Sequence, residues 1–169
     1  MKTVYGLDLL LPGNTLQEDL ARIIGWIADA VTLIDRHQTM LFVNGPEDCE
    51  AIERVAAMYD VDCERGIWLR LEDGWQTNER VFSDYGLTSH GHHRFLDLRL
   101  AAIVSLAAAE DGSSELGPAL EQAGEHAIAV NKQDDGRRLL AVDRHLIELL
   151  AGIARAYRCS FALAATTAD

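Results

Sequence analysis

Apolar positions change their spacing several times near the start of the chain, and each change marks an element. Residues 3–11 are apolar and rich in strand formers, and they stop at Pro12-Gly13-Asn14, which predicts a strand. Thr15 and Glu18 have the spacing of a capping box. Apolar side chains then recur at helical spacing, which predicts a helix: Leu16, Leu20, Ile23, Ile24 and Ile27.

The next residues predict a hairpin, a second helix and a strand. Two short apolar runs, 31–35 and 39–43, flank Arg36-His37-Gln38. Gly45 and Pro46 predict a helix start, because proline is preorganised for the first helical position. The expected buried stripe of this helix is Cys49, Ile52, Val55, Ala56 and Tyr59. Residues 66–71 (GIWLRL) predict the closing strand. The order β-α-β-β-α-β over residues 1–72 resembles a ferredoxin-like unit, so an α+β class is expected.

The second half predicts a related series. We interpret residues 94–110, an almost wholly apolar run, as a long helix, followed by a piece rich in Gly, Ser and Pro that ends near Gly124. Strands at 126–130 and 139–142 flank Asp134-Asp135-Gly136, Asp143 caps a helix, and 160–165 is a strand. RVAAMY (54–59) and GIARAY (152–157) match at an offset of 98 residues. The sequence allows a second β-β-α-β unit that shares one sheet with the first, but apolar helices followed by strands look alike by default, so a chance likeness is the leading alternative.

The length of 169 residues suits a single compact domain over residues 1–169. The alternative is two subunits, 1–72 and 94–169, joined by residues 73–93. This joining segment is rich in turn formers and contains Trp75, Phe82 and Tyr85. Loops of this length are uncommon in compact domains unless they bind something or move, so we expect a binding loop or a lid.

Acidic residues dominate the charge of the chain. The net charge is −12, and residues 1–75 carry 14 acids against 6 bases. Residues 47–64 hold seven acids opposed only by Arg54. Such a field repels phosphate backbones and attracts a basic protein, which argues against nucleic-acid binding. The sequence shows neither a signal-peptide pattern nor an apolar run that would cross a bilayer, so a cytoplasmic location is expected.

Three of the six histidines lie in Ser89-His90-Gly91-His92-His93. If the segment is extended, His90 and His92 share one side, and a helix starting near His93 would place Asp97 one turn further on. Together with Asp97 or Asp84, the residues His90, His92 and His93 would suit zinc or another divalent ion. HExxH and HxHxDH patterns are absent, so a solvated loop is the competing interpretation. No other cofactor is expected.

Sequence patterns of known catalytic chemistry are absent. There is no GxSxG, GxGxxG or GxxxxGK[ST]. Cys49, Cys63 and Cys159 are odd in number and lack a CxxC, so we expect buried free thiols. The pairs Asp134-Asp135 and Glu110-Asp111 lie beside glycine, as solvated turn residues do. No catalytic residue is assigned, and an enzyme is the less favoured class.

The sequence therefore favours a small acidic protein-binding module. The specific hypothesis is a stoichiometric inhibitor or immunity-type protein that neutralises a basic partner such as a toxin. The carboxylates expected to contact the partner are Glu47, Asp48, Glu50 and Glu53, for which a solvated helix face is the plain alternative. Trp75, in a polar turn, is the expected aromatic anchor, whereas Trp68 is expected in the core.

Two other functions stay open. One is a metal-binding protein or metal-dependent enzyme that uses the histidines from His90 to His93. The other is a small-molecule sensor in which ferredoxin-like units bind a metabolite between subunits. A homodimer is a further partner that the sequence allows.

Overall fold

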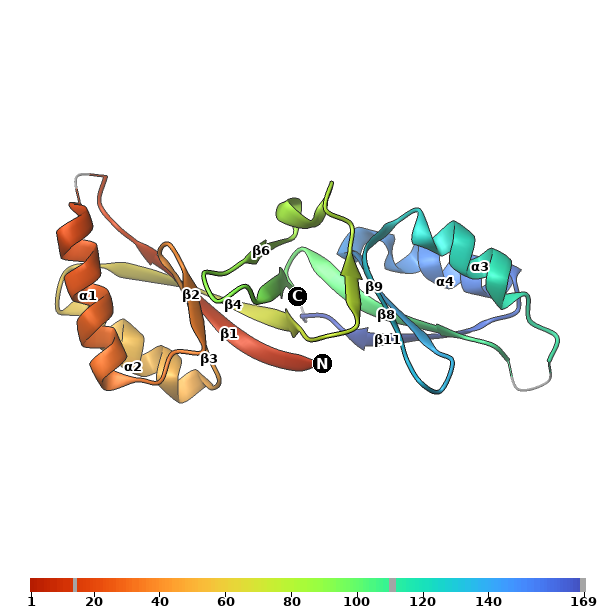
Figure 1. Cartoon of the computed structure of the whole chain (residues 1–169), viewed down its shortest axis with the longest axis horizontal. Coiled ribbons are helices and arrows are strands. Elements are labelled where there is room, and N and C mark those ends of the chain that lie inside the picture. The colour runs from red at the N-terminus through yellow and green to blue at the C-terminus, as the bar shows by residue number, and fades with distance from the viewer. Residues whose placement is uncertain (14, 110–111, 168–169) are drawn as a thin grey trace. The chain divides into compact units, whose positions relative to one another are not determined.

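A computed structural model describes residues 1–13, 15–109 and 112–167. Within these residues the protein is mixed α+β, with four α-helices and two antiparallel sheets (Figure 1). The chain divides into two compact units: unit 1 comprises Met1–Arg70 and Thr88–Phe95, and unit 2 comprises Leu71–Leu87 and Leu96–Asp169. The expectation of a single domain stays a prediction, and each unit is described by itself.

Residues 1–71, of which all but Leu71 belong to unit 1, contain the expected order of strands and helices. The elements are β1 (Lys2–Leu10), α1 (Gln17–Ala30), β2 (Asp35–His37), β3 (Met40–Val43), α2 (Pro46–Ala57) and β4 (Asp62–Leu71). β1 is central and antiparallel to both neighbours, with Tyr5 opposite Val43 of β3 and Ile67 of β4. With β6 (Gly86–Thr88) and β7 (Arg94–Asp97), the sheet has the strand order β2-β3-β1-β4-β7-β6.

The two faces of this sheet bury different side chains because residues alternate along a strand. Leu7 and Leu9 of β1 pack with α1 and α2, whose buried residues are Ile23, Ile27, Cys49, Ile52 and Ala56. An aromatic cluster also forms around Phe42, which stacks on Phe95 at 3.7 Å between ring centroids and meets Trp68 edge-on at 5.5 Å. Trp68 is buried as expected.

The start of α1 differs from the capping box that the sequence predicted. Leu16 occupies the N-cap position and makes no side-chain cap. Thr15 lies one residue before the N-cap, and its hydroxyl instead donates to the Pro12 carbonyl at 2.8 Å. The helix therefore starts later than the capping box predicts.

In the described part of the chain, no helix combines the length and the apolar character that crossing a membrane requires.

The prediction of a long helix over residues 94–110 is wrong, because residues 94–107 form two strands joined by a turn. Residues 94–97 form β7, a turn at Leu98 to Leu100 follows, and β8 (Ala101–Ala107) is a central strand between β10 and β11. Residues 101–106 are buried, so this strand is apolar on both faces and its sequence shows no period of two. A continuous apolar run fits a buried helix equally well, and Glu110, the predicted end, lies outside the described residues.

The remaining elements of unit 2 surround β8. They are β5 (Trp75–Thr77), the 3-10 turn η1 (Phe82–Asp84), α3 (Leu116–Gly124), β9 (Ala127–Lys132), β10 (Arg138–Asp143), η2 (Arg144–Leu146), α4 (Ile147–Ala156) and β11 (Ser160–Ala165). The strand order is β11-β8-β10-β9-β5, and α3 and α4 lie side by side (Figure 1). α3 was not predicted, because Pro118 reads as a helix breaker; in the first turn its missing N–H costs no helical bond. The segment expected as a loop over 73–93 contains β5, η1 and β6.

The two units have the same order of elements at an offset close to 98 residues. Both run β-α-β-β-α-β, and β11-β8-β10-β9 corresponds to β4-β1-β3-β2. Leu7 faces Leu41, and Ser105 faces Leu139, in the same register. The second helix of each unit ends in the same way, with a left-handed residue at Asp60 (φ 54°) and at Arg158 (φ 56°). In unit 2 this order includes a strand and a helix, β8 and α3, that the sequence did not reveal. The strands form two sheets where one shared sheet was expected.

Tyr85 connects two segments of unit 2. Its hydroxyl donates to Asp143 Oδ2 at 2.8 Å, while Asp143 Oδ1 accepts from the His145 N–H at 2.8 Å and caps η2. The bond to Asp143, together with desolvation, raises the pKa of the Tyr85 phenol. A raised pKa in the folded state stabilises below the unfolded value near 10, and this stabilisation disappears as the pH rises through the folded value.

We expect Tyr85→Phe to lower the free energy of unfolding by about 1 kcal/mol at neutral pH, because one hydrogen bond is lost while the ring is kept. Urea unfolding curves at pH 7 and above pH 10 measure the effect, which should shrink at the higher pH. An equal loss at both pH values would contradict this role of the hydroxyl.

Candidate functional site

The acidic residues of α2 lie at the start of the helix and along its exposed side. Glu47 and Asp48 occupy the first turn, where negative charge is favoured by the helix dipole. The Glu47 carboxylate folds over Gly45, since a Cβ at Gly45 would lie 2.5 Å from Glu47 Oε1. Glu47 and Glu50 are exposed and Asp48 is half-buried, so all three carboxylates reach the surface.

Glu53 differs from the other three acids because it is paired within the chain. Arg65 donates to both of its carboxylate oxygens, from Nε at 2.6 Å and from Nη2 at 2.7 Å. These bonds hold the pKa of the Glu53 carboxyl below its usual value. Glu53 therefore presents less net charge to a partner than Glu47 or Glu50.

Two exposed aromatic side chains, one from α1 and one just after the end of α2, form a pair. Trp26 of α1 and Tyr59 stack with 4.2 Å between ring centroids and 10° between planes. Trp26 is 37% exposed, Tyr59 is 40% exposed, and the adjacent Met58 is 70% exposed. The expectation that Tyr59 belongs to the buried stripe of α2 is wrong. The helix ends at Ala57 and the chain turns at Asp60, so the stripe does not continue to residue 59.

A cavity of about 350 Å³ opens beside this pair. Asp19 and Arg22 of α1 and Thr15, just before the helix, line it together with both rings. Asp19 and Arg22 form one contact, 3.7 Å long, in which both side chains are about half exposed. The cavity thus combines an aromatic wall with a carboxylate and a guanidinium at the surface of unit 1.

Trp75, the aromatic anchor expected from the sequence, is buried. It lies in β5, opposite Asn131 of β9, and is only 8% exposed. A binding anchor must offer ring surface to the partner, and Trp26 offers far more of it. Trp26 is not one of the residues of the apolar stripe predicted for α1. Its position outside the stripe is the signal in the sequence that its ring is exposed.

The pentapeptide Ser89–His93 forms a closed turn against β2. The Ser89 N–H donates to the His93 carbonyl at 2.9 Å, and His92 adopts a left-handed conformation (φ 61°). The Ser89 hydroxyl donates to Asp35, and His93 Nδ1 lies 2.5 Å from the same carboxylate oxygen. A Cβ at Gly91 would lie 2.6 Å from that oxygen, so a larger residue there would displace the Asp35 carboxylate.

The cluster of Asp35, Ser89 and His93 resembles a catalytic triad in composition but not in connectivity. Because a carboxylate only accepts hydrogen bonds, His93 Nδ1 carries the proton in this contact. Ser89 donates to Asp35 and not to the imidazole, so the histidine does not activate the hydroxyl as a nucleophile. Ser89 is 5% exposed, and the Asp35 side chain is 9% exposed. These contacts hold the turn to the edge of the sheet.

Asp35 makes the stability of unit 1 depend on pH. Burial raises the pKa of its carboxyl, but hydrogen bonds from Ser89, His93 and the backbone at Arg36 and Gly91 outweigh burial and lower it. A lowered pKa in the folded state adds stability above the unfolded value near 4, and this stability is lost as the pH falls through the folded value.

We expect Asp35→Asn to cost about 1–3 kcal/mol at pH 7, because charge-assisted bonds are lost, and to cost less at pH 3. Urea unfolding from pH 3 to pH 7 measures both quantities. Asp29→Asn, at an exposed position of α1, is the control and should leave the profile unchanged. A uniform loss at every pH would contradict the assignment.

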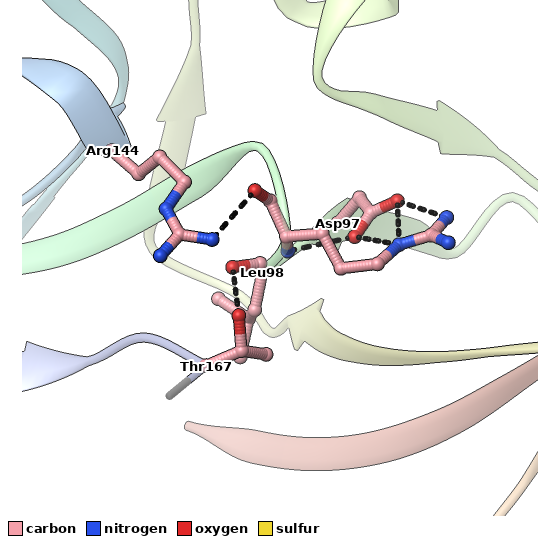
Figure 2. A network of polar contacts seen from close by, with 5 residues as sticks. Asp97, Leu98, Arg144 and Thr167 are labelled. Atoms are coloured by element: carbon pink, nitrogen blue, oxygen red, sulfur yellow. Dashed lines mark hydrogen bonds and ion pairs between the residues drawn. The ribbon is translucent and has the colours of Figure 1, made fainter. Parts of the chain in front are cut away.

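The residues proposed as metal ligands lie in both units. His90 and His92 are exposed, and His90 Nδ1 lies 3.3 Å from the Arg36 carbonyl. Asp97 and Asp84 belong to unit 2, where Arg99 donates to both oxygens of Asp97. Figure 2 shows the bonds that Asp97 accepts. Over residues 1–13, 15–109 and 112–167, no three His, Cys, Asp or Glu side chains gather as a metal site would require. A metal at the histidines stays a prediction.

The three cysteines are free thiols within the described residues. Burial raises the pKa of the Cys49 and Cys159 thiols, and burial with nearby Glu53, Asp62 and Asp8 raises the pKa of Cys63 to about 11. The thiolate is the nucleophilic form, so these cysteines are poor nucleophiles at neutral pH. The pair Glu110-Asp111 lies outside the described residues.

Unit 1 thus presents at its surface the Trp26–Tyr59 pair with its cavity and, on α2, the acids Glu47, Asp48 and Glu50. No protein-family model matches the sequence, and a comparison with curated proteins found no match.

Proposed function

We propose that this protein is a protein-binding module that recognises a basic partner through unit 1. The surface that would bind, called here the α2 face, comprises Glu47, Asp48, Glu50, Tyr59 and Trp26. The exposed, stacked Trp26–Tyr59 pair carries the proposal, because tryptophan and tyrosine dominate the energetics of interfaces. At the corresponding place in unit 2, Tyr157 is partly buried and packs against the hydrophobic core, so its ring is less exposed than that of Tyr59.

Charge supports a basic partner. Residues 17–30 and 46–65 contain ten acids and three bases, and the whole chain carries −12. Complementary charge accelerates encounter and fixes orientation more than it adds affinity. A second copy of the chain would bring the same acidic residues together, which disfavours a homodimer through this face.

The more specific proposal is a stoichiometric inhibitor or immunity-type protein, whose carboxylates occupy an anion-binding cleft of a basic enzyme such as a toxin. A small acidic surface with an aromatic anchor suits this role. The strand order β4-β1-β3-β2 and the helices of unit 1 also support a ferredoxin-like unit, a fold that hosts many functions and selects none. A metal-dependent enzyme and a small-molecule sensor stay predictions that no described contact favours.

The test begins with capture on the immobilised full chain and then measures the purified partner. The variant Glu47→Gln, Asp48→Asn, Glu50→Gln leaves the Glu53–Arg65 pair intact. We expect 1:1 binding by calorimetry, weakening as salt is added, and about tenfold lower affinity for this variant.

The matched control removes three exposed acids of unit 2 by Glu121→Gln, Glu125→Gln and Glu148→Gln, so that both variants have the same net charge. Equal affinities for the two variants would contradict a role for the α2 face.

A further inference from the structure

The cavity beside Trp26 and Tyr59 has a form that selects one kind of side chain. Trp26 and Tyr59 give it an aromatic wall, and Asp19 also lines it. The pairing of Asp19 with Arg22 is a single contact of 3.7 Å, whereas Arg65 holds Glu53 through two bonds of 2.6 Å and 2.7 Å. Asp19 is therefore only weakly held by its neighbour and is able to exchange that contact for a better one.

We infer that this cavity receives an arginine side chain of the basic partner, an inference that rests on the proposed function. A guanidinium is planar, so it stacks on an aromatic face and also binds a carboxylate through two parallel hydrogen bonds. The Trp26–Tyr59 wall and Asp19 offer both partners within one cavity. The incoming arginine takes the place of Arg22 on the Asp19 carboxylate.

The same features discriminate against other occupants. Lysine carries a compact, strongly hydrated charge that neither stacks nor forms the two parallel bonds. An anionic group is repelled by Asp19 and by Asp60 and Asp62, which flank the lining residue Val61 in the sequence. Arg22 competes with the incoming guanidinium, so its removal strengthens binding.

The test uses the full chain, labelled with ¹⁵N, and N-acetyl-arginine amide as the probe. We expect the Trp26 indole N–H resonance to shift and saturate at millimolar probe, the range of a single weakly held side chain. Trp26→Phe assigns that resonance. N-acetyl-lysine amide should bind several-fold more weakly.

Three single variants make the test specific. Asp19→Asn should weaken binding by about threefold or more, as expected for loss of one exposed ion pair, and Arg22→Gln should strengthen it. Asp29→Asn removes the same charge from α1 outside the cavity and should change little. Preserved dispersion of the amide spectrum shows that each variant folds.

The inference is overturned if the Trp26 resonance shows no saturable shift, if lysine binds as well as arginine, or if Asp19→Asn and Asp29→Asn behave alike. Because the probe needs no partner protein, this test can fail while the proposed function holds. Conversely, if arginine binds in the cavity but the variant with Glu47, Asp48 and Glu50 neutralised binds the partner with unchanged affinity, the proposed function alone is overturned.

Discussion

Phe42→Ala is expected to lower the free energy of unfolding of unit 1 by about 3–5 kcal/mol, the usual cost of removing a buried phenylalanine. Phe42 is fully buried and makes two ring contacts, stacked on Phe95 at 3.7 Å and edge-on to Trp68 at 5.5 Å. Alanine removes both contacts and leaves a cavity in the sheet. The protein interior closes such cavities only in part, which adds to the loss of transfer free energy.

Urea unfolding followed by tryptophan fluorescence measures this loss, because Trp68 reports on the neighbourhood of Phe42. Phe42→Leu, which keeps most of the volume, should cost clearly less. Leu163→Ala, at a position 47% exposed in β11, is the control and should change stability by at most about 0.5 kcal/mol. A loss below about 1 kcal/mol for Phe42→Ala would show that the aromatic cluster is not packed as described.

Trp26→Ala is expected to weaken binding of the basic partner by about 2–4 kcal/mol, or roughly 30-fold to 1000-fold in affinity. Trp26 is 37% exposed in the free protein and supports the Tyr59 ring. The variant loses the ring surface that a partner would cover and leaves Tyr59 without its stacking neighbour. Folding should be affected much less, because the ring is not part of the buried core of α1.

Calorimetry with the purified partner measures this effect, and thermal unfolding of the free variant shows how much of it comes from folding. Leu149→Ala is the control: Leu149 is a large apolar residue, 43% exposed, on α4 of unit 2 and outside the proposed surface. Equal affinity of Trp26→Ala and Leu149→Ala would remove the aromatic pair from the interface.

Sequence periodicity predicted elements well where one face is polar and poorly where both faces are buried. The order of the elements in residues 1–71 follows the prediction because α1 and α2 are amphipathic and Gly, Pro and Asn separate the strands. β8 was mistaken for a helix because it is apolar on both faces. Pro118 concealed α3 because a proline in the first turn and a proline in a loop look alike in sequence.

The candidate site was only partly readable for a related reason. Acids on α2 follow directly from composition, but the pairing of Glu53 with Arg65 depends on how β4 lies against the helix. Asp35 could not be linked to His93, 58 residues away, because neither residue carries a local signal of the other. Trp26 lies off the apolar stripe of its helix and was detectable; Tyr59 was misassigned because the predicted helix extended too far.

The central claim is that unit 1 binds a basic partner with the α2 face. Amide hydrogen exchange of the full chain, measured with and without the purified partner, tests it most directly. We predict that the partner slows exchange most strongly around Trp26, along α2 and at residues 58–62. Slowed exchange confined to unit 2, or to the turn Ser89–His93, would contradict the account.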